Sequence, residues 1–572
     1  MKKVTLFLLP LAIASAGCSK DSDFPWDSYD NSSSSSQSGT KKTSGVTGAT
    51  TIDVSYDEED LISGTKFGRT ITINFSDAAG ASVSGDENGI VSIDGNNVTV
   101  DNTSTSEKVK YVLTGSTTNG FLKIYSNNKQ ALYLSGVSIR NPNGAAINNQ
   151  GKKRCFVVLS GENTLKDGSS YTATPDDEDE KAAFFSEGQL IFSGDGSLSV
   201  VATGKAGITS DDYLHFIGEN TVVTVTSAGG HAVRGKDYVM VSAGTLNASS
   251  SAAMKKGVSS DSLVVFNGGV TNITVSGGTA YDSDDNEYKA AAGVKADQLF
   301  IMNAGEVNIT STGAGGKGIN GDGPAYFQGG TLTVNVKGSN YGSSSNNRPG
   351  GSSSSSDSSK SAKGIKFDGN IYVSGGDIVV TSASHEGFES KGVIEITGGN
   401  LYVKAYDDAI NSKGNLAITG GNVMAWSTGN DGIDANGDCF IEGGVVYAIG
   451  KGSPEVAIDA NTEDGYKLYV NGGTLFAIGG LESGSVLSQT CYSSNSWSKN
   501  TWYSLTAGNA TYGFKSPSSG GTGLVVSAAS KPTVKSGASA TADIWEGMGA
   551  LSSSVSGGSE VTLSTYSGGG GR

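Results

Sequence analysis

A Gly-Gly turn, or a close variant of it, recurs along most of this chain and is followed each time by alternating apolar residues. In the clearest stretch the first glycine of the turn is Gly375, Gly398, Gly420 and Gly443, so successive units lie 23, 22 and 23 residues apart. Upstream the interval is 24 or 25 residues, except where polar inserts lengthen two units. A unit of this length has room for two or three short strands and no helix. The repeat therefore predicts a stack of β coils.

Strands too short to build a hairpin core stack most economically as a parallel β-helix, in which neighbouring coils pair at about 4.8 Å. We expect an all-β, right-handed parallel β-helix over residues 49–480, with coils of 22–25 residues. A β-propeller fits less well, because each blade needs about 40 to 50 residues. Residues 481–572 lose the repeat but keep β-prone runs, which predicts a small β-rich C-terminal cap with a disordered tail.

The beginning of the chain has the pattern of a bacterial lipoprotein signal. Two lysines and a short apolar run are followed by the small residues "SAG" and then by Cys18. We expect residues 1–17 to be removed, Cys18 to carry lipid, and residues 18–48, which are rich in Ser and Gly, to act as a flexible tether. These features predict an outer-membrane lipoprotein. The acidic residues just after Cys18 resemble the surface-export signals of some Gram-negative outer-membrane lipoproteins, and this resemblance implies exposure at the cell surface.

Charge and cysteine content exclude several classes of function. A net charge of -16 argues against nucleic acid as a partner, because phosphate binding needs clustered Lys and Arg. Cys155, Cys439 and Cys491 are odd in number and lack CxxC spacing, so we expect buried thiols and neither disulfides nor a zinc cluster. We expect a monomer.

One carboxylate-rich phrase returns in successive coils as "HEGFESKG", "DDAINSKG" and "NDGIDANG". Aligning Phe388, Ile410 and Ile433, with Ile458 as a fourth, stacks the acidic residues in columns. Stacked carboxylates repel one another, and oxygen ligands in neighbouring columns suit Ca²⁺. The alternative is that these residues only form turns and ladders. Among the stacked phrases, the one with His385 and Glu386 is the weaker candidate for holding the metal. The predicted metal ligands are Glu386, Glu389, Asp407, Asp408, Asn411, Asn430, Asp431, Asp434 and Asp459.

Period two within the strands also predicts an outward aromatic column. If Leu401, Val403 and Ala405 face the core, the intervening residues face outward. Flat aromatic faces would suit sugar rings; the alternative is that residues 481–572 fold over them. The predicted carbohydrate-binding residues are Tyr402, Trp426, Tyr447 and Phe476.

The phrases "GITSDDYLHFIG", "AVRGKDYVMVSAGTL", "DDAINSKGNLAITGGNV" and "NDGIDANGDCFIEGGVVYAIG" resemble a calcium-binding, polysaccharide-lyase-like β-helix family of carbohydrate-binding domains. The resemblance covers residues from about 50 to 480. It implies a right-handed β-helix with bound Ca²⁺ that binds cellulose or acidic, pectin-like polysaccharide without cleaving it.

Two other functions stay open. The same scaffold supports calcium-dependent pectate lyases, in which a Lys or Arg removes a proton beside a uronate carboxylate. Lys413 and Lys451, with Lys391 nearby, lie in or near the turns and would be the candidate bases. The third possibility is a rigid surface adhesin or spacer with no specific glycan.

Overall fold

The structure is a computed structural model that describes residues 2–7, 41–172, 178–342, 358–551 and 554–568. Cys18, most of the predicted tether, the Ser-rich residues 343–357 and the last four residues lie outside this range. In the described part of the chain, no helix is long and apolar enough to cross a bilayer.

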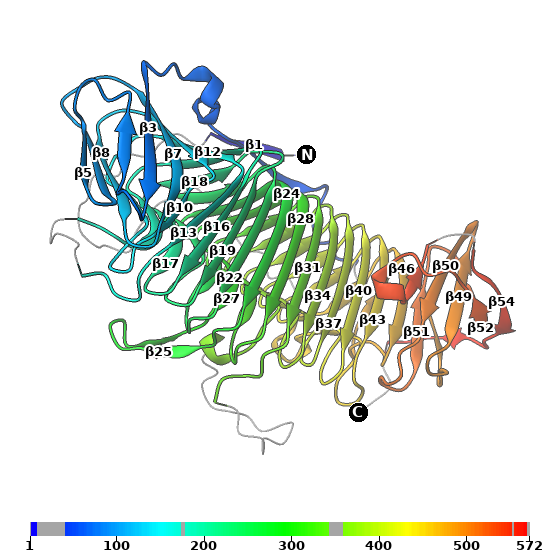
Figure 1. The fold of residues 1–572 in the computed structure, drawn as a ribbon. Coiled ribbons are helices and arrows are strands. Elements are labelled where there is room, and N and C mark those ends of the chain that lie inside the picture. Colours follow the sequence, from blue (N-terminus) through cyan, green and yellow to red (C-terminus); the bar gives the residue numbers. More distant parts are fainter. Residues whose placement is uncertain (1, 8–40, 173–177, 343–357, 552–553, 569–572) are drawn as a thin grey trace.

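Short strands stack side by side into a parallel β-solenoid of about 14 coils (Figure 1). Each strand of a coil pairs in parallel with its equivalents in the neighbouring coils, as β38 does with β35 and β41. This arrangement confirms the predicted parallel β-helix and excludes a propeller. We name the three long faces A, B and C.

Face A is built from the strand that precedes the Gly-Gly turn, or its variant, in each coil. Its strands are β9 (Gln130–Ser135), β12 (Cys155–Ser160), β15 (Leu190–Gly194), β18 (Tyr213–Phe216), β21 (Tyr238–Val241), β30 (Ala325–Phe327), β33 (Ile371–Val373), β36 (Ile394–Ile396), β39 (Leu416–Ile418), β42 (Cys439–Ile441), β45 (Leu468–Val470) and β47 (Val486–Leu487). Three long strands run over faces A and B together: β7 (Val109–Thr117), β24 (Leu263–Val275) and β28 (Leu299–Ser311).

Face B follows the Gly-Gly turn. Its strands are β10 (Ser138–Arg140), β13 (Glu162–Lys166), β16 (Ser197–Ala202), β19 (Val222–Ser227), β22 (Thr245–Ser250), β31 (Thr331–Val336), β34 (Asp377–Ser382), β37 (Asn400–Ala405), β40 (Asn422–Ser427), β43 (Val445–Ile449) and β46 (Thr474–Ile478).

Face C is a separate 15-stranded sheet, and it carries the acidic phrases. Its strands are β5 (Val91–Asp94), β6 (Asn97–Asn102), β8 (Phe121–Ser126), β11 (Ile147–Asn149), β14 (Ala182–Ser186), β17 (Ala206–Ser210), β20 (Val233–Gly235), β23 (Lys256–Ser260), β27 (Ala292–Ala296), β29 (Lys317–Gly321), β32 (Ile365–Phe367), β35 (Phe388–Ser390), β38 (Ile410–Ser412), β41 (Ile433–Ala435) and β44 (Ile458–Ala460).

The solenoid interior follows the predicted alternation. Leu401, Val403 and Ala405 of β37 are buried in one continuous core that runs through the coils, and the equivalent residues of β40 and β43 join them. The Gly-Gly turn between faces A and B has a steric cause. Gly421 has φ +80°, and a Cβ there would lie 2.8 Å from the backbone of the preceding coil. The three predicted buried thiols, of Cys155, Cys439 and Cys491, are free and buried.

The residues before the first coil form an extended strap, residues 42–64, that the sequence did not predict. The strap holds β2 (Thr50–Ser55) and the short helices η1 (Glu58–Asp60) and η2 (Ile62–Gly64). It lies along face A in the direction opposite to the coil order, from the ion pair of Lys42 with Asp438 to that of Asp60 with Arg154. Ile52 and Val54 pack on outward apolar residues of face A. The strap therefore covers an apolar row that would otherwise be exposed.

The end of the strap is fixed by a buried polar cluster. Asp60 accepts hydrogen bonds from Arg154 Nε at 2.7 Å and Tyr213 Oη at 2.5 Å, and its other oxygen lies 2.7 Å from His215 Nδ1. The other ring nitrogen of His215 lies 2.9 Å from Ser242 Oγ. This Asp-His-Ser order has the connectivity of a hydrolase triad, but the Ser242 N–H already donates to the Phe216 carbonyl and is not free to stabilise an oxyanion. Asp60 and His215 are 0% exposed, and their bonds clamp the strap to face A.

Several elements lie outside the three faces. Strand β1 (Lys2–Phe7) pairs with β2, and it lies inside the predicted signal peptide, whose removal stays a prediction. The first coil starts with strands β3 (Arg69–Ser76) and β4 (Ser82–Ser84). A hairpin around the acidic residues 282–287 is formed by β25 (Ala280–Asp282) and β26 (Glu287–Lys289). The short helices η3 (Ser358–Lys360) and η4 (Thr462–Asp464) lie in turns.

A C-terminal module, residues 482–568, closes the last coil. Strand β51 (Leu524–Ser527) pairs antiparallel with β46 and with β48 (Cys491–Ser494), so it covers the edge that β46 would leave open. This confirms the predicted β-rich cap. Its remaining elements are β49 (Trp502–Ala507), β50 (Ala510–Lys515), β52 (Thr533–Ser539), η5 (Trp545–Gly547), β53 (Gly549–Ala550), β54 (Ser556–Glu560) and β55 (Ser564–Thr565).

Candidate functional site

The acidic phrases lie in register on face C. Phe388, Ile410, Ile433 and Ile458 pair directly with one another across β35, β38, β41 and β44, as the alignment of the phrases predicted. The next residue of each strand then forms one column, consisting of Glu389, Asn411, Asp434 and Asp459. We call the nine predicted metal ligands on this face the acidic ladder.

Asn411 links two carboxylates at the centre of the acidic ladder. Its Nδ2 donates to Asp408 Oδ2 at 3.0 Å and to Asp434 Oδ2 at 2.8 Å. The other oxygen of Asp408 accepts the N–H of Asp431 at 3.1 Å. Asp431 in turn accepts the Val456 N–H at 2.5 Å. The side chains of successive coils are therefore held in contact by neutral donors alone.

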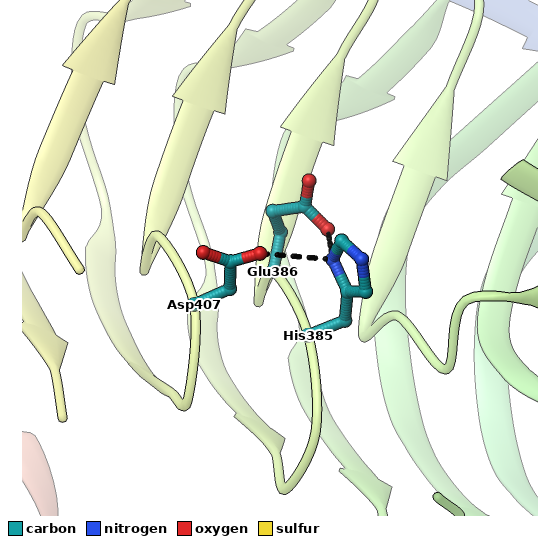
Figure 2. Close-up of side chains that lie close together, drawn as sticks. All are labelled: His385, Glu386 and Asp407. Atoms are coloured by element: carbon teal, nitrogen blue, oxygen red, sulfur yellow. Dashed lines mark hydrogen bonds and ion pairs between the residues drawn. The ribbon is translucent and has the colours of Figure 1, made fainter. Parts of the chain in front are cut away.

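A second row of the ladder is formed by Asp407 and Asn430, the residues that precede Asp408 and Asp431. Asn430 Nδ2 donates to Asp407 Oδ1 at 2.9 Å, and the other oxygen of Asp407 lies 3.2 Å from His385 Nδ1. Figure 2 shows the His385 Nδ1 bonded to both Glu386 and Asp407. One ligand atom from each of these three side chains lies within 4.8 Å of the others, which is close enough to share a cation.

The central carboxylates carry perturbed pKa values. Burial, and then the charges of Asp434, Asp407 and Asp431, raise the pKa of Asp408 well above its usual range. Burial raises the pKa of Asp431 to about 7 and, together with Asp407, that of Asp434 to about 6. Within the described residues, no Lys or Arg forms an ion pair with these three carboxylates.

Asp459 ends the column beside a further acid that the sequence reading missed. Leu481 bridges to Ile458, which places the next residue, Glu482, beside Asp459. Burial and a hydrogen bond with Glu482 raise the pKa of Asp459 to about 8. The sequence repeat gives little indication of Glu482, because this residue lies where the repeat ends.

The opposite end of the ladder is neutralised by lysine. Lys363 Nζ lies 3.2 Å from Glu386 and 2.6 Å from Glu389, and Lys391 also pairs with Glu389. Burial alone would raise the pKa of Glu386, but the bond from His385 and the charge of Lys363 outweigh it and hold that pKa at about 2. Glu386 and Glu389 thus already have cationic partners. Lys363 was missed because the alignment of the phrases began at His385, one coil later.

The predicted aromatic column faces outward, but the C-terminal module covers most of it. Tyr447 and Phe476 are 0% exposed and Tyr402 is 6% exposed, all within a second core shared with the module. This corrects the expectation of an open sugar-stacking face, because rings at such positions have no free surface. Trp426 lies at the margin of this core, with Lys404 Nζ 4.0 Å from its ring centroid.

The two candidate lyase bases lie in solvent. Lys413 and Lys451 are both exposed, at the turns that follow β38 and β43. The third candidate, Lys391, is bound to Glu389.

A family model matches this chain over residues 94–253, 251–340, 313–409 and 376–516, and its description is carbohydrate-binding domain-containing protein. The chain belongs to this carbohydrate-binding domain family. The matched ranges include the whole acidic ladder, so the ladder is part of the family domain and not an appendage. The predicted family resemblance is confirmed.

Among solved structures, the chain is similar to a polysaccharide lyase-like protein from C. thermocellum, in a gadolinium derivative. The two share 20% sequence identity with a TM-score of 0.37, over 45% of this chain and 96% of that one. A likeness of this size carries no functional argument. No curated protein matches the chain.

Proposed function

We propose that this member of the carbohydrate-binding family holds Ca²⁺ in its acidic ladder and uses it to bind polysaccharide without cleaving it. The observation that supports the proposal is the group Asp408, Asp431 and Asp434. Asp408 comes from one coil, and Asp431 and Asp434 come from the next. Asp408 and Asp431 are buried and Asp434 is half-buried, and none of the three has a Lys or Arg partner among the described residues. Buried carboxylates are normally paired or bound to a metal.

The donor set fits calcium better than other common metals. Asp407, Asp408, Asp431 and Asp434 supply carboxylate oxygens, and Asn411 and Asn430 supply amide oxygens after rotation of their side chains. Ca²⁺ accepts six to eight such oxygens with flexible geometry, whereas Mg²⁺ requires a strict octahedron. His385 adds a nitrogen at the edge of this set, and it is engaged by Glu386 and Asp407.

Bound calcium would supply open coordination positions for uronate carboxylates or sugar hydroxyls. The protein residues would fix where those positions point, because backbone N–H groups anchor two of the carboxylates: that of Asp431 bonds to Asp408, and that of Val456 bonds to Asp431. This arrangement would let a chain of net charge -16 bind an acidic, pectin-like polymer as well as cellulose.

The test compares wild type with a double variant that carries both Asp408→Asn and Asp431→Asn. The control is Glu219→Gln, whose side chain is exposed on another coil. We expect the double variant to lose bound calcium and, with it, retardation in gels containing polygalacturonate. Chelator should do the same to wild type and to the control. Unchanged calcium content in the double variant would refute the ladder as the metal site. Glycan binding that does not change with calcium or chelator would refute the dependence of polysaccharide binding on calcium.

The non-catalytic part of the proposal has its own test. Because Lys413 and Lys451 are exposed, we expect polygalacturonate to stay intact after long incubation with calcium-loaded protein. A calcium-dependent rise in ultraviolet absorbance from unsaturated uronate ends would show a lyase instead. A stable protein that binds no glycan in any condition would favour the rigid spacer.

We also propose attachment to the outer membrane through lipid on Cys18, on the strength of the sequence motif alone. Metabolic labelling with palmitate and membrane fractionation should place wild type in the membrane and a Cys18→Ser variant in the soluble fraction. Equal labelling of the two proteins would contradict the anchor.

A further inference from the structure

A polar cavity of about 250 Å³ opens on the early coils of face C, far from the acidic ladder. Seven strands of face C, from β14 to β32, separate β11 beside the cavity from β35 at the start of the ladder. Its lining is unusually rich in asparagine and consists of Asn97, Asn119, Phe121, Lys123, Asn141, Asn143, Ala145, Asn148 and Glu180.

The cavity is built by the stacking of three coils. Asn97 of β6 pairs with Phe121 of β8, and Lys123 of β8 pairs with Asn148 of β11, so these four side chains lie on one face in two neighbouring columns. Asn141, Asn148 and Glu180 are buried, whereas Asn119 and Asn143 are exposed. The cavity thus has a buried polar floor and an exposed amide rim.

One floor residue has an unused hydrogen-bond donor. Asn148 is 2% exposed, and its Nδ2 is buried with no hydrogen-bond partner in the described part of the chain. Its orientation is fixed, because Asn148 Oδ1 accepts from Gln150 Nε2 at 2.6 Å and that nitrogen also donates to the Asp179 carbonyl at 2.7 Å. A buried amide donor without a partner is uncommon in native proteins and calls for a ligand or bound water.

The remaining floor is held rigid by bonds that do not use the cavity. Asn141 Nδ2 donates to the Ala145 carbonyl at 2.7 Å, and its oxygen accepts the Asn143 N–H at 3.0 Å. One oxygen of Glu180 accepts the Ala145 N–H at 2.6 Å. A preformed floor of this kind orients a ligand at low entropic cost.

The charges in the cavity select against an anion. Lys123 Nζ lies 2.7 Å from Glu178, which is also bonded to the Tyr125 hydroxyl, so the lysine charge is already matched. Glu180 adds a carboxylate to the floor. A uronate, sulfate or phosphate group in the cavity would meet the negative charge of this carboxylate.

From these observations we infer that the cavity is a second saccharide site, which takes a neutral sugar ring without calcium. Amides both donate and accept, as sugar hydroxyls do, and Glu180 accepts from hydroxyls. Phe121, half-buried at the wall, offers an apolar face to the C–H side of a ring. The volume lies just below the range of about 300 to 1,000 Å³ of ordinary ligand pockets, which suits one ring or a chain end.

The experiment measures binding of neutral monosaccharides in chelator. Full-length mature protein is titrated with methyl glycosides of glucose, galactose, xylose and arabinose, and with galacturonate for comparison, using calorimetry and saturation-transfer NMR. We expect millimolar binding of at least one neutral sugar in EDTA, with galacturonate weaker. Loss of roughly 10-fold in affinity is expected for Asn148→Leu, which removes the unused donor. The control Asn495→Leu, an exposed amide of the C-terminal module, should bind like wild type.

Two further variants keep the inference testable if Asn148→Leu fails to fold. Asn143→Ala changes only the exposed rim and should weaken neutral-sugar binding by a few-fold, while the calcium-site double variant should leave it unchanged. The inference is overturned if no neutral sugar binds in EDTA, if binding survives both cavity variants, or if galacturonate binds best. Failure here leaves the calcium-dependent proposal intact, because that proposal is tested with an acidic polymer and calcium.

Discussion

Phe476 of the last solenoid coil and Phe514 of the C-terminal module stack with their ring centroids 4.5 Å apart and 11° between their planes. Both rings are 0% exposed. The outward column of face B and the module therefore share one core, in which Tyr447 also packs against Phe514 and Trp545. The module is part of the folding unit at this end of the solenoid.

Replacing Phe514 should destabilise the solenoid end as well as the module. We expect Phe514→Ala to lower the free energy of unfolding by about 3 to 5 kcal/mol, because truncating a buried Phe removes its packing and leaves a cavity. Urea denaturation measures the change. Tyr466→Ala, at a ring that is 38% exposed, is the control and should change stability little. Equal stability of the two variants would show that the shared core contributes nothing.

The clamp between the strap and face A predicts a local opening. Asp60→Asn would remove the most buried of the three carboxylates that pair with Arg154, while Asp57 and Glu59 would still pair with it. Breaking a buried pair costs at most about 3 to 5 kcal/mol. We expect proteases to cut the strap much faster in Asp60→Asn than in wild type. Glu58→Gln, an exposed neighbour in the same strap, should be cut like wild type.

The same clamp should weaken in acid. Burial of Asp60 raises its pKa, but hydrogen bonds from His215, Tyr213 and Arg154 outweigh this and hold the pKa below 3.8. The stabilisation is therefore present above about pH 4 and is lost as the pH falls through the lowered pKa. The difference in strap cleavage between wild type and Asp60→Asn should shrink over that range. A difference that stays constant down to the lowest pH would contradict this.

A buried lysine on face C should cost stability at neutral pH. Burial, and then the charges of Lys363 and Lys366, lower the pKa of Lys317 from 10.5 to about 7, while its Nζ donates to the Ser361 carbonyl at 3.2 Å. Glu389 also faces this group and opposes the shift. Between pH 7 and 10.5 the unfolded chain binds a proton that the folded chain lacks, so wild-type stability rises with pH in this window.

Lys317→Met should thus be more stable than wild type at pH 7, by on the order of a few kcal/mol, and its advantage should shrink as the pH rises towards 10.5. Urea unfolding at pH 7 and pH 10 checks both values. Lys337→Met, at an exposed lysine of the same coil, should show no such trend. An advantage that is independent of pH would indicate better packing by Met and not the titration of Lys317.

The bridge that Asn411 forms predicts that a negative charge at this position lowers stability without metal and raises the affinity for metal. Asn411→Asp would replace a donor to Asp408 and Asp434 with a third negative charge, so we expect a lower unfolding midpoint in chelator. On the proposed calcium site, the variant should gain more stability than wild type from added calcium, because binding stabilises by RT ln(1 + [L]/Kd). Asn495→Asp is the control. Equal calcium responses would count against a cation at Asn411.

The sequence predicted the parts of this molecule that repeat. Aligning Phe388 with Ile410 and Ile433 was enough to obtain the register of face C, because a residue's place in a coil fixes its neighbours one coil away. Inward residues such as Val403 followed from the alternation within a strand. For the same reason the columns of the acidic ladder were predicted residue by residue.

Contacts between segments that do not repeat could not be obtained this way. Nothing in the period places Phe514 on Phe476, or Asp60 beside His215, because each pair joins the solenoid to a segment outside it. The asparagine cavity was missed for a related reason. It depends on Asn148 having no partner for its Nδ2, and the sequence does not reveal which amides of an Asn-rich stretch are satisfied.

The course of the strap also bears on how the molecule would stand on a surface. Lys42 meets the solenoid beside Asp438 and Asn471, near its last coils, and only then does the chain return along face A to the first coil. An attachment made through the residues just before 41 would therefore place the late coils and the C-terminal module nearest the surface. The asparagine cavity would point away from it, at the tip, and would reach a distant polymer before the acidic ladder does.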